Sequence, residues 1–334
     1  ACTMLLRAVS TPRDMSVKGI SLSIEAGMAS FEHRLPADTD AATLLALSLG
    51  AQADASRDAQ RLTCASGTAG TQPGQKASAD DKLDVIALTS DSRLVCFNEH
   101  KPAKARLIGM VHGLQGDTRL VGIDFRVQDG LLYGVGEAGG VYTLNTANAT
   151  ATLVNRLSVP LSGTTFGVDF NPAADRLRIV SDVGQNLRHN VNANGVTLAD
   201  GTLNYTAGTP AAGLVAAAYT NNDLSPATPA TTGTTLFVLD ATQDQLVLQS
   251  PPNAGALMAT GKLTVDISTT TGFDIYSVLR DGITVSNRAL ATVVAADGAA
   301  SLYNVDVLTG KAHNRGKLAA GLNVVDIAVP LSQH

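Results

Sequence analysis

Tryptophan is absent from this chain of 334 residues, and aromatic residues make up only 4% of it. Charged residues make up 16%, and lysine and arginine stand singly, so no basic cluster could neutralise a run of nucleic-acid phosphates. No apolar run reaches the roughly 18 residues that a membrane-spanning helix needs. The composition therefore predicts neither a nucleic-acid partner nor a membrane span.

Cysteines are few as well, at positions 2, 64 and 96. An odd number leaves at least one of them unpaired within the chain. Cys96 lies in the apolar stretch Leu94–Phe97 and is predicted to be a buried free thiol. Cys2 and Cys64 form a tentative disulfide that would fasten the N-terminal segment, and a lipid anchor on Cys2 is the alternative.

The chain opens at Ala1 without an initiator methionine. Such a start is typical of a mature end left after an export signal is removed. We therefore expect an extracellular, cell-surface or periplasmic location.

The main positive feature is a repeat in which one aspartate sits inside the same short apolar run. It occurs at Asp124, Asp169, Asp274 and Asp326, and Ala218 occupies the corresponding place in a fifth copy. By difference of residue numbers, successive copies lie 45, 49, 56 and 52 residues apart. A period of about 40 to 50 residues with four strands per unit is typical of a β-propeller.

Each repeat unit reads as an antiparallel meander. The clearest copy has apolar strands at 120–126, 131–135, 141–145 and 151–157. The dipeptides Asp129-Gly130 and Gly139-Gly140 separate the first three of these strands and suit tight hairpin turns of type I′, in which both central residues have positive φ.

The two ends of the repeat region complete each other. Residues 83–110 supply three strands without an aspartate strand, and residues 322–329 supply an aspartate strand alone. Joined in one sheet they make a fifth blade and remove two unpaired sheet edges. The sequence thus predicts an all-β, five-bladed β-propeller whose N- and C-terminal strands close one blade. A six-bladed ring would need a further unit between Ala218 and Asp274.

Residues 1–81 do not share the repeat and form an N-terminal extension with a linker, followed by the propeller domain at 82–334. Ile20, Leu22 and Ile24 alternate as in a strand, and Asp40 suits the cap of a short helix. The extension is either a strap on the outside of the propeller or a segment that pairs with another subunit. In the second case residues 1–80 would build a homo-oligomer or a filament.

Several long motifs occur within residues 84–330. They are Ser162-Gly163-Thr164-Thr165-Phe166-Gly167-Val168-Asp169-Phe170-Asn171-Pro172, Asp175–Asp182, Gly184–Arg188, Asp200–Leu203 and Ala218–Asn221. On these residues the chain resembles a family of exported bacterial propellers catalogued as a domain of unknown function. The resemblance implies the fold and an extracytoplasmic home, and it brings no catalytic residues.

The repeated aspartates are the first candidate site. If their strands are innermost, the carboxylates of Asp124, Asp169, Asp274 and Asp326 surround a central channel. Such a ring suits Ca²⁺, which takes six to eight oxygen ligands. The structural alternative is that each carboxylate accepts hydrogen bonds from turn amides and fixes its own blade.

A polar cluster in the blade of Asp169 is the second candidate, a ligand-binding site. Its members are Asn171, Arg176, Arg178, Asp182, Gln185, Asn186 and Arg188. Arg178 and Arg188 are placed to form a fork for a carboxylate or for sugar hydroxyls, because guanidinium groups donate in a planar pair. The structural alternative pairs Arg176 with Asp182 across a hairpin.

No catalytic residue is assigned, because none of the six histidines lies in a Gly-x-Ser-x-Gly or His-Glu-x-x-His motif. The sequence therefore favours a secreted, non-catalytic propeller that binds or assembles at the cell surface or in the extracellular matrix. One alternative is a calcium-dependent hydrolase or lactonase that uses the channel carboxylates. Another is a propeller that binds a surface glycan.

Overall fold

The computed structural model describes two compact units, Ala1–Ala55 and Ser56–His334. In the first unit it describes three strands, β1 (Thr3–Ala8), β2 (Ile20–Ala26) and β3 (Ala29–Leu35). In the second it describes residues 83–331 and 333, except for 193, 225–230 and 296–297. None of the described residues belongs to an α-helix that could cross a lipid bilayer.

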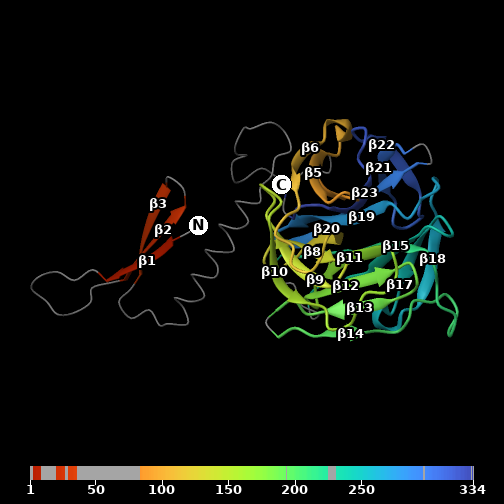
Figure 1. The fold of residues 1–334 in the computed structure, drawn as a ribbon, viewed down its shortest axis with the longest axis horizontal. Helices are drawn as coiled ribbons and strands as arrows, with labels where there is room; N and C mark the ends of the chain where they lie inside the picture. The colour runs from red at the N-terminus through yellow and green to blue at the C-terminus, as the bar shows by residue number, and fades with distance from the viewer. Residues whose placement is uncertain are drawn as a thin grey trace, which may run out of the picture. The chain divides into compact units, whose positions relative to one another are not determined.

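The second unit is a five-bladed β-propeller of four-stranded antiparallel sheets (Figure 1). Blade 1 contains β7 (Leu120–Phe125), β8 (Leu132–Gly136), β9 (Gly140–Leu144) and β10 (Ala151–Arg156). Blade 2 contains β11 (Phe166–Asn171), β12 (Arg176–Ser181), β13 (Asn186–His189) and β14 (Thr197–Ala199). Blade 3 contains β15 (Leu214–Tyr219), β16 (Leu236–Asp240), β17 (Gln245–Gln249) and β18 (Leu257–Lys262).

Blade 4 contains β19 (Thr271–Arg280), β20 (Ile283–Val294), β21 (Ala300–Val305) and β22 (Ala312–Lys317). Blade 5 contains β23 (Val324–Ala328), β4 (Asp84–Thr89), β5 (Arg93–Asn98) and β6 (Arg106–Met110). Two short 3₁₀ helices, η1 (Pro102–Lys104) and η2 (Pro252–Ala254), lie between the third and fourth strands of blades 5 and 3.

The ring closes in blade 5, where the two ends of the domain share one sheet. β23 pairs antiparallel with β4, with Asp326 opposite Leu88 and Ile327 opposite Ala87. This confirms the predicted closure and the count of five blades. The region between Ala218 and Asp274 supplies the remaining strands of blade 3, so the six-bladed alternative is wrong.

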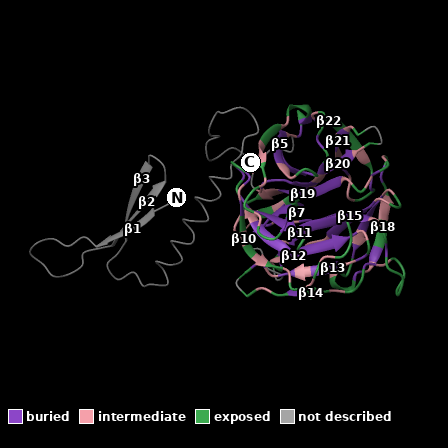
Figure 2. Cartoon of the chain, in the orientation of Figure 1, coloured by how far each residue is buried: buried purple, intermediate pink, exposed green. Residues whose placement is uncertain are grey.

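The innermost strands are β7, β11, β15, β19 and β23. Each lies at one edge of its sheet and contacts the innermost strand of the next blade. Because they are covered on both faces, their residues are almost all buried, whereas β6, β10, β18 and β22 are largely exposed (Figure 2). Blades pack through apolar side chains, and one core cluster contains Phe97 of blade 5 together with Tyr276 and Leu290 of blade 4. Burying one such side chain stabilises the fold by about 1.5–3 kcal/mol.

The hairpin turns differ in detail from the prediction. Gly130 has φ 70° and Gly139 has φ 86°, and in each turn only that one residue is left-handed. A type I′ turn needs two such residues in succession. The turn between β19 and β20 has them, at Asp281 (φ 54°) and Gly282 (φ 77°).

Cys96 is disulfide-bonded, so the prediction of a buried free thiol is wrong. Cys2 and Cys64 lie outside the described residues, so the bridge between them stays a prediction. The apolar context of Cys96 suits a buried disulfide as well as a thiol, which is why it misled.

The first unit is a three-stranded antiparallel sheet with β2 in the middle. β2 contains the strand predicted through Ile20, Leu22 and Ile24. Its register sets Ile24 opposite Met4 of β1 and opposite Phe31 of β3. The helix predicted after Asp40 and the linker up to residue 81 lie outside the described residues.

Candidate functional site

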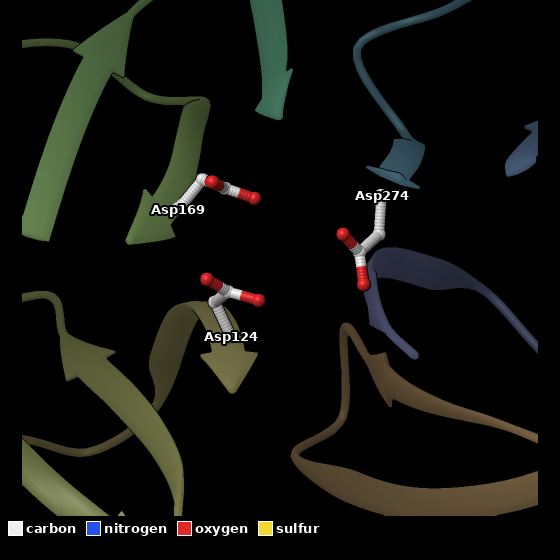
Figure 3. A group of neighbouring side chains, drawn as sticks. All are labelled: Asp124, Asp169 and Asp274. Carbon is white, nitrogen blue, oxygen red and sulfur yellow. The ribbon is translucent and has the colours of Figure 1, made fainter. Parts of the chain in front are cut away.

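The four repeated aspartates lie on innermost strands of four blades, and all are buried. Asp124, Asp169 and Asp274 each offer a carboxylate oxygen, and these oxygens lie within 4.8 Å of one another. Figure 3 shows the three carboxylates pointing into one space from separate strands. Asp326 does not belong to this group of three.

Each carboxylate accepts a hydrogen bond from the backbone of the next blade. In the first two blades, Oδ2 of Asp124 accepts from the Phe170 amide at 2.7 Å, and Oδ1 of Asp169 accepts from the Tyr219 amide at 3.0 Å. These amides belong to innermost strands rather than to turns. The sequence alternative, in which each carboxylate accepts from turn amides and fixes its own blade, is therefore wrong about the donors. The carboxylates instead join neighbouring blades.

The same contact continues around the ring. Oδ2 of Asp274 accepts from the Val329 amide, directly after β23, at 2.5 Å. Oδ2 of Asp326 accepts from the Ile123 amide of blade 1 at 2.9 Å. Four of the five junctions between blades thus contain an axial bond from a carboxylate to an amide.

In the copies of Asp124, Asp169 and Asp274, a glycine two residues before the aspartate gives the neighbouring strand room to approach, whereas Val324 stands there in the copy of Asp326. A Cβ on Gly167 would lie 2.5 Å from the Ala217 nitrogen, and one on Gly272 would lie 2.7 Å from the Ile327 nitrogen. No real Cβ atom tolerates backbone that close. In the motif Gly-x-Asp, the glycine lets the innermost strands of two blades come close, and the aspartate bonds across the gap between them. The motif was visible in the sequence, but this role was not.

Burial and mutual repulsion govern the charge of this ring. Burial raises the pKa of Asp124 and Asp169 well above the ordinary value, and neighbouring aspartates raise it further. Burial also raises the pKa of Asp326 well above its ordinary value, and that of Asp274 to about 6. The backbone amides oppose these shifts because they stabilise the ionised form. The ring consequently holds protons more strongly than exposed carboxylates do.

The three clustered carboxylates partly fit a calcium ion. Oxygens within 4.8 Å of one another can share an ion at the usual calcium–oxygen distance of about 2.3–2.6 Å. They supply three ligands of the six to eight required. Both oxygens of Asp274 already accept amide hydrogens, from Val329 and Ile275, which weakens that residue as a ligand.

Arg178, the centre of the predicted ligand site, is only 2% exposed. Its Nη1 donates to Asn186 Oδ1 and to Asp200 Oδ2, both at 2.7 Å. Its Nε donates to the Tyr219 hydroxyl at 3.2 Å, and its Nη2 donates to Asn253 Oδ1 at 2.8 Å. Arg178 therefore joins blades 2 and 3 through bonds within the chain.

Arg188 binds the same carboxylate. Its Nε and Nη2 donate to the two oxygens of Asp200 at 2.6 and 2.8 Å. The predicted fork of Arg178 and Arg188 is thus present, but Asp200 occupies it. Glycan binding at this place stays a prediction from the sequence.

The other members of the predicted cluster bond to nearby turns or to the segment that leads into β11. Asn171 accepts from the Ala174 amide, and Arg176 donates to the Asp175 carbonyl. Asp182 accepts from Thr164, so its carboxylate is engaged by residues other than Arg176. Gln185 accepts from the Ser162 amide and donates to the Pro160 carbonyl. These residues do not converge with Arg178 on one open site.

Two partly buried ion pairs between blades escaped the sequence analysis. Arg126 of blade 1 donates to both oxygens of Asp175 in blade 2, at 2.7 and 2.6 Å. Arg288 of blade 4 pairs with Glu99 of blade 5 at 2.6 Å, and Glu99 is 1% exposed. Each partner is distant in sequence, and nothing in the local pattern marks it.

These observations define a closed, all-β propeller whose blades are joined at the axis by buried carboxylates. The chain belongs to the family described as domain of unknown function DUF4394, whose model matches residues 93–328. The match confirms the resemblance noted from the motifs. No curated protein matches the sequence.

Solved structures with a similar fold are distant in sequence. Hydrazine synthase of Kuenenia stuttgartiensis is 9% identical, with 63% of this chain and 53% of that chain covered and a TM-score of 0.37. Glutaminyl cyclase of Myxococcus xanthus is 15% identical, with coverages of 64% and 71% and a TM-score of 0.35. An auxiliary nutrient binding protein from Bacteroides ovatus is 12% identical, with coverages of 69% and 58% and a TM-score of 0.37. No functional inference follows from likenesses at this level.

Proposed function

We propose that this protein is a non-catalytic assembly protein outside the cytoplasm, in which the closed propeller is the rigid body and the N-terminal sheet makes the contacts. The observation that carries this proposal is the separate compact unit Ala1–Ala55, whose described part is one three-stranded sheet. A sheet of this size needs a packed face to be stable. An extension of this kind suits assembly better than it suits catalysis.

The bonding of the propeller supports the same proposal. The groups most suited to chemistry are engaged within the fold, because the axial carboxylates bind backbone amides and Arg178 binds Asp200. A catalytic group needs free access to a substrate atom. The buried polar groups are thus better suited to holding the blades rigidly together than to acting on a substrate.

The disulfide at Cys96 supports a location outside the cytoplasm. Disulfides persist in oxidising compartments and are rare in the cytosol. Cell surface, extracellular matrix and periplasm all meet this condition.

Deletion of residues 1–55 tests the proposal. Mass in solution is measured by light scattering across a range of concentrations, for the full chain and for the deletion variant. We expect the full chain to be oligomeric and the variant to be monomeric, with the cooperative unfolding of the propeller retained. A full chain that stays monomeric at every concentration would exclude the assembly function.

A calcium-dependent hydrolase is the second candidate, favoured by the three carboxylate oxygens within 4.8 Å of one another. A bound ion there would polarise a substrate carbonyl. The test measures metal content and thermal unfolding in calcium and in chelator, for the wild type, Asp169→Asn and the control Asp182→Asn. One tightly held ion, lost only in Asp169→Asn, is the result expected of this function. Metal-free protein with no calcium effect on unfolding would remove it.

A further inference from the structure

Two segments that are far apart in the sequence meet at the outer side of the propeller, where blades 4 and 5 adjoin. Residues 101–106 contain η1 and the first residue of β6, and residues 311–317 contain β22. β22 and η1 are in contact, and a Cβ on Gly316 would lie 3.3 Å from Cγ of Pro102. The segments are therefore neighbours, although by difference of residue numbers their starts lie 210 residues apart.

These two segments are rich in exposed positive charge. Of the ten exposed lysines and arginines among the described residues, six lie here, namely Lys101, Lys104, Arg106, Lys311, Arg315 and Lys317, and the other four are Arg119, Arg156, Lys262 and Arg280. We call the six the basic rim. Neither segment contains an aspartate or a glutamate. The fold thus brings together basic residues that stand singly in the sequence.

No carboxylate among the described residues forms an ion pair with the basic rim. The acidic residues nearest to the two segments in sequence are engaged by other groups. Glu99 is 1% exposed and pairs with Arg288 at 2.6 Å. Asp306 accepts from the Leu308 amide at 2.9 Å. Like charges within a Debye length of about 8 Å reinforce one another's field, so the basic rim attracts anions.

We propose that the basic rim binds an extended anionic polysaccharide, whose carboxylate or sulfate groups pair with its lysines and arginines. The chain has a net charge of −5, so it repels polyanions except where positive charge is concentrated. β22 has six residues and is about 20 Å long, which lets it contact several charges of one polymer. This inference takes the location outside the cytoplasm from the proposed function, and it does not depend on assembly through the N-terminal sheet.

The composition of the two segments favours a hydrated polymer over a lipid surface. Residues 101–106 and 311–317 contain no apolar side chain larger than proline. Leu107 and Leu308 are exposed beside them, but two aliphatic side chains insert too little apolar area for stable anchoring in a membrane. A polyanion needs no insertion, because it pairs with exposed cations and releases its counterions.

Binding of the full chain to immobilised dextran sulfate and to alginate, a polyuronate, tests the proposal, with uncharged dextran as the control polymer. The rim variant Lys104→Glu/Arg315→Glu reverses one cation in each segment. The matched variant Arg119→Glu/Arg280→Glu makes the same change of net charge at exposed arginines outside the basic rim. We expect the wild type to bind an anionic polymer and not dextran. The rim variant should bind at least about tenfold more weakly, and the matched variant within about twofold of the wild type.

Equal losses in the two variants would overturn the proposal, because net charge and not the basic rim would then control binding. Binding to neither anionic polymer, or tighter binding to phosphatidylglycerol vesicles or to single-stranded DNA, would overturn it as well. None of these results bears on the oligomeric state, so the proposed assembly is tested separately.

A milder variant covers the case in which the charge reversals disturb the fold. Lys104→Gln/Arg315→Gln removes the same two charges without adding negative ones. Its cooperative unfolding should match that of the wild type, because both side chains are exposed. Its affinity for the anionic polymer should lie between those of the wild type and the rim variant, and wild-type affinity in this variant would overturn the proposal.

Discussion

Blade 2 and blade 3 are each joined to the next blade, but by different hydrogen bonds. β11 carries Gly167 and Asp169, and β15 carries Ala216 and Ala218 at the corresponding positions. Asp169 accepts from the Tyr219 amide of blade 3, but β15 itself has no carboxylate to extend toward blade 4. The ring therefore lacks one axial bond out of five.

The junction of blades 3 and 4 has a clamp instead. Asp223, in the loop after β15, accepts from the Thr284 amide at 2.7 Å and from its hydroxyl at 2.6 Å. Asn221 and Asn287 exchange two hydrogen bonds, at 3.1 and 2.7 Å. The hairpin of β19 and β20 is long enough to reach this loop. Closure of a blade junction thus needs a bond across it, and either an axial carboxylate or a loop can supply it.

The largest loss of stability is expected from filling the space beside Gly167, where the innermost strands of blades 2 and 3 approach each other. Gly167→Val would place side-chain carbons against the Ala216 and Ala217 backbone, which cannot withdraw. We expect a loss of more than about 4 kcal/mol of unfolding free energy, or no closed fold. The control is Gly233→Val, because nothing lies within 4 Å of a Cβ at Gly233. Denaturant unfolding of both variants measures the difference, and similar losses would show that the axial approach is not tight.

Ala218→Asp places a carboxylate on β15 at the position that is aspartate in the other four blades, and so tests the comparison of blades 2 and 3 directly. Ala218 is fully buried, and a new charge there would add to the repulsion among Asp169 and Asp274. We expect a loss of about 3 kcal/mol at pH 8. Ala218→Asn has the same size without the charge, so the gap between the two variants should widen as pH rises. A constant gap from pH 4 to 8 would mean that charge does not decide this position.

Asp223→Ala removes the clamp and should cost about 2 kcal/mol, because it leaves the Thr284 amide without its acceptor. Asp182→Ala is the matched control, since Asp182 binds the amide and hydroxyl of Thr164 in the same way but at an exposed place within blade 2. We expect the control to lose less than about 1 kcal/mol. Chemical denaturation compares them, and equal losses would remove the clamp from the account of this junction.

The smallest predicted effect is a pH dependence. The pKa of Asp274 rises from 3.8 to about 6 in the folded state, so its stabilising contribution is complete below pH 3.8 and is lost as pH rises through 6. Relative to wild type, Asp274→Asn should gain about 1 kcal/mol between pH 5 and 7.

The difference curve between Asp274→Asn and wild type is needed because His189 acts in the opposite direction. Burial lowers the pKa of His189 to about 4, so its contribution is lost as pH falls below about 6.5. Subtracting the unfolding free energies of the two proteins at each pH removes the histidine term. A difference that does not change between pH 5 and 7 would contradict the raised pKa of Asp274.

The repeat of aspartates predicted the blade count, the innermost strands and the closing pair of β23 and β4, because each depends on a local pattern and its spacing. The partners of the polar side chains could not be predicted in the same way. Asp200 fills the fork of Arg178 and Arg188 because it directly follows β14, which pairs with β13 and brings the carboxylate beside both arginines. The disulfide of Cys96 likewise left no mark in its apolar sequence context.

In the N-terminal unit, the alternation in β2 was visible in the sequence, but its register with β1 and β3 was not. Register is set by pairing across a sheet, and no tight-turn signal marks the long connection between β1 and β2. The pairing of the three strands becomes apparent only when they are aligned in the sheet.

The contact from Asp326 to the Ile123 amide has a consequence for how the protein is made. β23 pairs with β4 in its own blade, and its Asp326 accepts from β7, the innermost strand of blade 1. A nascent chain that has not yet reached residue 328 can fold its earlier blades. It still leaves the unpaired edge of β4 open to other chains. Closure of the ring therefore depends on β23, and a chain truncated before Val324 would keep two unpaired sheet edges.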